Sequence, residues 1–312
     1  MTPPISMLLL TTLTGFGYGL LAWLGGLALL GVLPPAPFFV PVAVVIALIF
    51  STAGLIASTA HLGRPERAWR AFSQWRSSWL SREGVAAMLT TPPAICFAAS
   101  WWWFVPGSIV TKLFGILTAG LALLTVFCTS MIYGSLKPIR QWHNPHTPVD
   151  YLIYAIFSGA VLLSALWSIW FGSASAIAIA AMVMAGAAAI AKFAYWRFID
   201  QQKPLASLAS AIGIEGISTK VRPLDQPHFT ENYILREMGF QIARKHAAKL
   251  RRIITVIAFA VPAFLVLLAA FRILPALTAT LAACLALVGL FIERWLFFAE
   301  ATHVSALYYG RG

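Results

Sequence analysis

Charged residues are scarce in this chain, making up 10% of its 312 residues, whereas 60% of the residues are hydrophobic. The mean hydropathy of +0.82 lies far above the range of soluble proteins and indicates a polytopic membrane protein. In a soluble protein, the formal net charge of +12 would suggest nucleic-acid binding. Here the cationic residues fall in loops between apolar segments, where they first determine topology, so we expect no nucleic-acid partner.

Cysteine and histidine are also too few for the common metal sites. Cys96, Cys128 and Cys284 lie far apart and form no C-x-x-C pair, so we expect no iron–sulfur or zinc site in this chain. We expect all three to act as small buried apolar side chains. No histidine lies in the middle of an apolar segment, where a membrane haem often sits. His61 and His303 would be the best haem-ligand pair, but we favour a chain without haem.

The apolar residues are grouped in long runs. A membrane-spanning helix needs about 20 mostly apolar residues. Eight segments qualify, at 7–31, 39–60, 84–105, 109–134, 150–171, 175–196, 253–271 and 275–298. We therefore predict an all-α integral membrane protein, an eight-helix bundle that forms a single polytopic domain over residues 1–312. The first segment has no basic flank or cleavage pattern and is predicted to be a retained span. The sixth, rich in alanine with Gly186, predicts close helix packing.

The positions of the basic residues predict the topology. With eight spans, both chain ends share one face with the loops after the second, fourth and sixth spans. These loops hold 5, 2 and 10 basic residues, which is 17 of the 22 in the chain. The positive-inside rule places this face in the cytoplasm. The arginine-rich loop 61–83 and the long loop 197–252 are therefore predicted to be cytoplasmic. Within the long loop, residues 230–252 predict an amphipathic helix on the membrane surface.

Polar chemistry is concentrated in the loop 61–83, where His61 ends one span and Glu83 opens the next. A quinone needs a hydrogen-bond partner for its carbonyl oxygen and a nearby proton donor or acceptor. A histidine and a partly desolvated glutamate supply both. We therefore predict a quinone site at His61 and Glu83. The predicted site also includes Arg64, Trp142 and His143.

The residues alone leave structural alternatives open. His61 could cap the second span, and Glu83 could pair with Arg82 or Arg64. Four arginines of the loop could dock an acidic partner surface or bind anionic membrane lipids, and they serve equally well as topology determinants; they are Arg67, Arg70, Arg76 and Arg82. Glu293, inside the eighth span, is predicted to pair with Arg294 or with an arginine of the second loop. A stand-alone membrane transporter would show internal repeats or broken helices, and we find neither clearly.

Two motifs in this region are similar to a known family. His61-Leu62-Gly63-x-Pro65-x-Arg67-Ala68 and Ser78-x-Leu80-Ser81-x-Glu83 resemble the membrane anchor subunit of dimethyl sulfoxide reductase. The eight-span layout and the chain length agree with this family. The resemblance implies an anchor that binds no metal cofactor itself. It holds a molybdopterin catalytic subunit and an iron–sulfur subunit, and it exchanges electrons with quinol. The family's quinol-binding histidine and glutamate fall on His61 and Glu83.

Within the family, the segments 141–145 and 236–246 are more similar to the anchor of cytoplasmic sulfite dehydrogenases. This resemblance implies that the partner subunits oxidise sulfite on the cytoplasmic face of a bacterial inner membrane. Electrons would then reach ubiquinone or menaquinone through the iron–sulfur clusters. The first alternative is a quinol-oxidising anchor of a dimethyl sulfoxide-type reductase. A stand-alone transporter and a haem-carrying anchor are the others.

Overall fold

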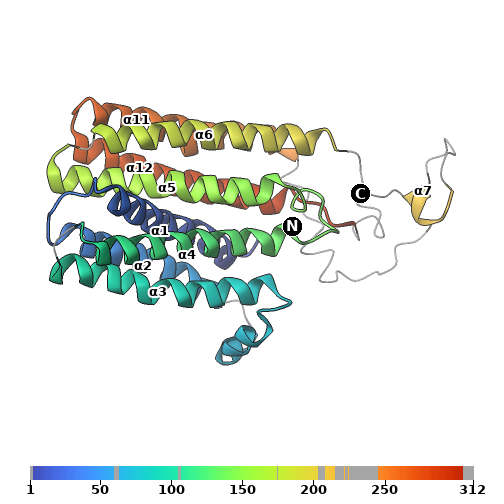
Figure 1. Ribbon diagram of the computed structural model, residues 1–312. Helices are drawn as coiled ribbons and strands as arrows, with labels where there is room; N and C mark the ends of the chain where they lie inside the picture. Colours follow the sequence, from blue (N-terminus) through green and yellow to red (C-terminus); the bar gives the residue numbers. More distant parts are fainter. Residues whose placement is uncertain are drawn as a thin grey trace.

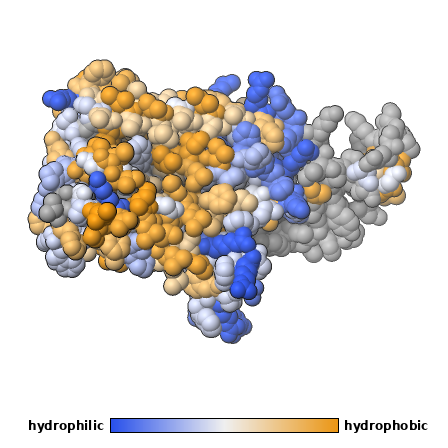
Figure 2. All heavy atoms as spheres, viewed as in Figure 1, coloured by the Kyte–Doolittle hydropathy of each residue, from blue (hydrophilic) through white to orange (hydrophobic). Residues whose placement is uncertain are grey.

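The computed structural model describes residues 3–59, 63–104, 107–173, 175–202, 208–214, 221, 224 and 245–304. Over these residues the chain is helical and contains no strand. Eight helices are long and apolar enough to cross a membrane, as predicted, and they lie side by side in one bundle (Figure 1). Apolar side chains form a belt around the bundle, while hydrophilic side chains gather toward one end (Figure 2). The chain is therefore built as a multi-pass membrane protein.

The spans begin and end close to the predicted positions. They are α1 (Ile5–Leu30), α2 (Phe39–Thr59), α3 (Trp79–Trp103), α4 (Ile109–Gly134), α5 (His146–Phe171), α6 (Ser175–Asp200), a seventh span (Ala247–Ala270) and α12 (Pro275–Ala299). The seventh consists of α10 (Ala247–Ile254), the π-helical turn η2 (Thr255–Ala260) and α11 (Val261–Ala270). Two short elements, η1 (Pro65–Gln74) and α7 (Leu208–Ala211), lie in the connecting segments. Of the predicted amphipathic helix 230–252, residues up to 244 lie outside the described residues.

The third, fifth and seventh spans start at least one turn earlier than hydropathy predicts, because their first turns are polar. In α3, Ser78 caps the helix, and its side-chain oxygen accepts a hydrogen bond of 3.4 Å from the backbone nitrogen of Ser81. A serine at this position satisfies one of the unpaired amides of the first turn. As a result, Glu83 lies in the second turn of a helix and not at its boundary.

The helices form two groups that meet along α1 and α5. In the first group α1 packs on α2 and α4, and α3 packs on α4 and α2. In the second group α5 packs on α6 and α12, while α11 packs on the same two helices. The start of α1 and the end of α12 lie at one end of the bundle, together with η1 and the connection 135–145 (Figure 1). We call this end the polar end.

Glycines bring α1 into backbone contact with its neighbours. A Cβ atom added at Gly19 or at Gly25 would overlap backbone atoms of α5 or α4, respectively. Gly19 faces Gly159, and Gly25 faces Gly115. Small residues allow such close approach in membranes, where helices associate through packing. At Gly186 of α6 an added Cβ would meet no atom within 4 Å, so the prediction of close packing at this glycine is wrong.

The contact at Gly19 predicts a large difference between two glycine substitutions in the same helix. Gly19→Ala places a methyl group against the backbone of Ala155 and should destabilise the fold by about 1–3 kcal/mol, the usual cost of overpacking. Gly26→Ala, with open space at that position, should be neutral or stabilise the helix by up to about 1 kcal/mol. Thermal unfolding of the two purified variants in detergent measures both effects. Equal melting temperatures would contradict the close α1–α5 contact.

The cysteines only partly follow the prediction of burial. Cys128 is buried, whereas Cys96 and Cys284 are exposed on the surface of the bundle. The prediction is therefore wrong for these two. In a membrane, an apolar side chain gains little by facing protein instead of lipid, because lipid tails are equally apolar. Apolar character in a span thus does not indicate which face of the helix a residue occupies.

Candidate functional site

Glu83 is buried inside the bundle near the polar end, with 3% of its surface exposed. Its Oε1 accepts a hydrogen bond of 2.6 Å from the hydroxyl of Thr129 in α4. Among the residues that the structure describes, no donor contacts Oε2 of Glu83, and no cation forms a salt bridge with this carboxyl group. The alternative in which Glu83 pairs with Arg82 or Arg64 is therefore not observed. One carboxyl oxygen is available to a ligand or a proton.

The groups around Glu83 come from three helices. Those within electrostatic range are Tyr18 of α1, Cys128 and Tyr133 of α4, and Tyr151 of α5. All of these are phenols or a thiol, which are neutral at neutral pH. Glu83 is thus a buried acid in neutral surroundings. Such groups are rare in membrane spans and commonly functional.

The residues on either side of Glu83 hold η1 against α3. The Arg82 side chain donates to the carbonyls of Trp75 at 2.9 Å and Arg76 at 2.7 Å, just after η1. The Ser81 hydroxyl donates to the carbonyl of Ala71. The ring of Phe72 lies directly over Gly84, where a Cβ atom would come within 2.8 Å of it. The short helix η1 is therefore fastened to the turn of α3 that carries Glu83.

The predicted docking arginines fall into two kinds. Arg82 is committed to the two carbonyls after η1 and also lies 4.2 Å from the ring centre of Trp79. The others are exposed, and they lie beside the exposed rings of Trp69 and Trp75; they are Arg64, Arg67, Arg70 and Arg76. These cations and rings make η1 a basic, aromatic surface at the polar end.

The remaining predicted site residues are separated from Glu83. His61 lies outside the described residues. Trp142 is buried in the core, and its ring nitrogen donates to the carbonyl of Phe297 at 3.0 Å. His143 is exposed, and its Nδ1 lies 2.6 Å from the carbonyl oxygen of Gly134. The ring nitrogen of Trp142 and Nδ1 of His143 are thus both engaged by backbone carbonyls.

A buried ion cluster joins α6 to α12. Glu293 pairs with Arg294 at 2.5 Å, as predicted, and its other oxygen lies 2.5 Å from Nζ of Lys192. All three side chains are at most 4% exposed. Asp150 of α5 lies within electrostatic range of Lys192 and Arg294 and is 2% exposed. The sequence reasoning missed this cluster, although a lysine inside an apolar span was a signal that could have revealed it.

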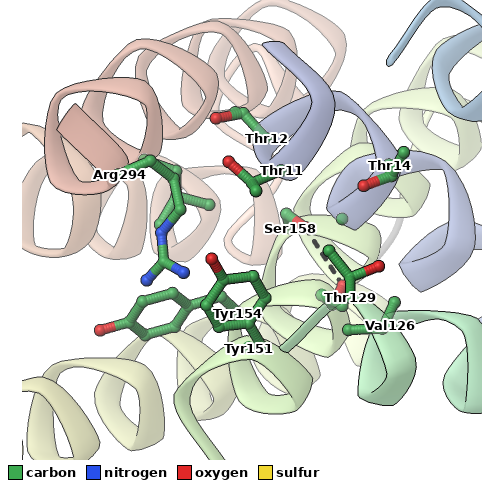
Figure 3. Close-up of a pocket in the computed structure, with 12 residues that line it drawn as sticks. Thr11, Thr12, Thr14, Val126, Thr129, Tyr151, Tyr154, Ser158 and Arg294 are labelled. Carbon is green, nitrogen blue, oxygen red and sulfur yellow. Dashed lines mark hydrogen bonds between the residues drawn. The ribbon is translucent and has the colours of Figure 1, made fainter. Parts of the chain in front are cut away.

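A small cavity, which we call the polar chamber, lies between α1, α4, α5 and α12. Its polar lining includes Thr11, Thr12, Thr129, Tyr151, Tyr154, Ser158 and Arg294. The guanidinium group of Arg294 lies 4.3 Å from the ring centre of Tyr151 and 5.1 Å from that of Tyr154. Figure 3 shows Arg294 reaching toward these rings, with Thr11 and Thr12 across from them. The chamber measures about 20 Å³, room for about one water molecule.

A second ion network closes the polar end of the later helices. Arg251 of α10 binds Asp200 at the end of α6, with distances of 2.6 and 2.9 Å, and it also binds Glu300 just after α12. Burial raises the pKa of the Glu300 carboxyl above its ordinary value, while the Arg251 guanidinium opposes that rise. This network holds together the ends of three helices and is structural in character.

Comparison with known proteins follows the same direction as these features. The family described as DMSO reductase anchor subunit (DmsC) matches residues 1–310 of the chain. The chain belongs to this family. A sulfite dehydrogenase subunit of Allochromatium vinosum, the one designated C, is 33% identical, and the alignment covers 99% of each chain. Anaerobic dimethyl sulfoxide reductase chain YnfH of Escherichia coli is 28% identical over 119 residues, 36% of this chain and 39% of that one. No solved structure matches.

Both resemblances expected from the sequence motifs are thereby confirmed. The chain is a DmsC-type anchor subunit, and its full-length similarity is to a subunit of sulfite dehydrogenase. In this DmsC-family anchor the polar end brings two features together. The basic surface of η1 is exposed, and directly beneath it α3 carries the buried Glu83. A partner bound on η1 would therefore lie close to that carboxyl group.

Proposed function

We propose that this chain is the membrane anchor and quinone-reactive subunit of a three-part oxidoreductase. A molybdopterin catalytic subunit oxidises sulfite, and an iron–sulfur subunit transfers the electrons to ubiquinone or menaquinone. Both partners dock at the polar end, on the cytoplasmic face of a bacterial inner membrane. The full-length similarity to a sulfite dehydrogenase subunit supports the choice of sulfite. The basic residues of η1 and of the long loop support a cytoplasmic polar end.

The observation that carries the proposal is the position of Glu83 beneath η1. Reduction of a quinone to a quinol takes up two electrons and two protons, so the site needs a proton donor next to the electron donor. Glu83 is buried, has an available Oε2, and lies on the helix that holds η1. The polar chamber on the Thr129 side is too small for a quinone ring. The head group therefore binds at Oε2, where His61 and Arg64 supply further hydrogen-bond donors.

The arginines of η1 have a separate role in this proposal. Arg67, Arg70 and Arg76 are exposed and bind an acidic surface of the iron–sulfur subunit, which brings its last cluster within reach of the quinone. Electron delivery and proton uptake then occur on the same side of the membrane. The quinone step itself moves no charge across the bilayer.

Gentle detergent purification of the chain from its native membrane tests this proposal. We expect two larger chains to co-purify, with molybdenum, many iron atoms per complex and no haem band in the reduced-minus-oxidised spectrum. A chain that purifies alone and without metals would contradict the anchor role and favour a stand-alone transporter. A haem band would instead indicate a cytochrome-type anchor.

The reverse direction of electron flow is the second candidate, because YnfH, a dimethyl sulfoxide reductase chain, matches part of the sequence. In that case quinol is oxidised at Glu83, and a sulfoxide is reduced by the catalytic subunit. The same purified sample distinguishes the two directions. Sulfite-dependent quinone reduction supports the first candidate, and quinol-dependent sulfoxide reduction supports the second.

A further inference from the structure

The polar chamber contains buried polar atoms that the protein itself leaves without partners. Four of its lining groups make no hydrogen bond within the described part of the chain; they are Thr12 Oγ1, the Tyr151 and Tyr154 hydroxyls, and Arg294 Nη2. Each of these side chains is at most 5% exposed. Buried polar groups in proteins are nearly always hydrogen-bonded, and ordered water supplies the bond where protein does not. A chamber with room for about one water molecule and four such groups around it is built to bind water.

The chamber is connected to a carboxyl group on each side. Toward α3, Thr129 lines the chamber and donates to Glu83, while Tyr151 lies within electrostatic range of the same carboxyl. Toward the polar end, Tyr154 lies within electrostatic range of Asp150. Oδ1 of Asp150 is buried and has no hydrogen-bond partner among the described residues. Asp150 lies in the first turns of α5, which begins at the polar end.

We infer that the chamber holds water and that this water and three hydroxyl groups form a proton relay between Asp150 and Glu83. The hydroxyl groups are those of Thr129, Tyr151 and Tyr154. Hydroxyl groups and water each donate and accept, so a chain of them passes a proton without any change in its heavy atoms. This inference rests on the proposed function, because the relay is used only if Glu83 exchanges protons with a quinone.

The relay accounts for one of the two protons in each turnover. The quinone takes two electrons from the iron–sulfur subunit, and Glu83 gives its carboxyl proton to one quinone oxygen. The resulting carboxylate is reprotonated through the relay, and Asp150 regains its proton from water at the polar end. The second quinone oxygen is protonated from the side of His61. The positive charge of Arg294 lies beside the chamber and stabilises the carboxylates between the transfers.

Removing single hydroxyl groups tests the relay in the purified complex of all three subunits. Tyr154→Phe and Thr129→Val keep the size of each side chain and should each lower quinone turnover about tenfold or more, within the range for lost proton transfer. The solvent deuterium isotope effect on quinone turnover should rise, because proton delivery becomes rate-limiting. The KM for quinone and the dye-linked activity of the catalytic subunit should stay unchanged, since neither depends on the relay.

Two matched substitutions outside the chamber serve as controls. Tyr195→Phe removes a hydroxyl that donates to the carbonyl of Gln141 at 3.1 Å. Thr118→Val removes one that donates within α4, to Phe114 at 2.7 Å. Both should keep the normal turnover and isotope effect. Normal turnover in Tyr154→Phe would overturn the relay. If Glu83→Gln is then slow, the proposed function stands without the relay; if Glu83→Gln is also normal, the proposed function fails as well.

Discussion

Replacing Glu83 by glutamine should lower quinone turnover of the complex by about 100-fold or more, because the amide can neither release nor take up a proton. The substitution keeps the shape of the side chain and an oxygen that can accept the hydrogen bond from Thr129. We therefore expect normal assembly of the three subunits. Dye-linked sulfite oxidation should be unchanged, because the dye takes electrons before they reach the membrane. The two assays on one purified sample give the ratio that measures the effect.

A second carboxylate near the same surface provides the control. Glu66 lies in η1 with its side chain 67% exposed, and Glu66→Gln should leave both activities near their normal values. An equal fall of both activities in Glu83→Gln would show that Glu83 supports assembly and not the quinone step. Normal activities in both assays would remove Glu83 from the site. The quinone would then have to be protonated elsewhere on the chain.

Replacing Lys192 by methionine should destabilise the bundle by about 3–5 kcal/mol, which is the usual cost of removing one partner from a buried ion pair. Lys192 lies 2.5 Å from Glu293, and both side chains are at most 1% exposed. Methionine fills a similar volume, so the effect arises from the unpaired charge and not from a cavity. Thermal unfolding in detergent and the yield of assembled complex measure the loss. Lys112→Met, at the opposite end of the bundle, should change neither.

The charge balance of the cluster allows a rescue experiment. Lys192 and Arg294 are balanced by Glu293 and Asp150, so loss of Lys192 leaves one excess negative charge. Adding Asp150→Asn to Lys192→Met restores neutrality and should recover part of the lost stability. No recovery in the double variant would show that Asp150 is not coupled to the cluster. Because Asp150 also belongs to the inferred relay, the rescued protein should remain slow in quinone turnover.

Hydropathy alone was sufficient to place the spans of this protein. All eight predicted segments are helical, and the boundaries differ mainly where a polar first turn belongs to the helix, as in α3. The reason is that lipid acts on every segment separately. Each span must satisfy its own backbone and present enough apolar surface, whatever its neighbours are. The motif around Glu83 likewise predicted the family, because the motif is local to one turn of the chain.

The partners of the buried polar groups depended on the tertiary structure. Lys192 meets Glu293 across 101 positions of sequence, and Glu83 meets Thr129 across 46. The sequence also led to Trp142 as a site residue, but its ring nitrogen is engaged by the carbonyl of Phe297 in the core. Which faces of two helices meet depends on where backbones can approach, as at Gly19 and Gly159. An apolar pattern carries no record of this, because in lipid both faces of a span are apolar.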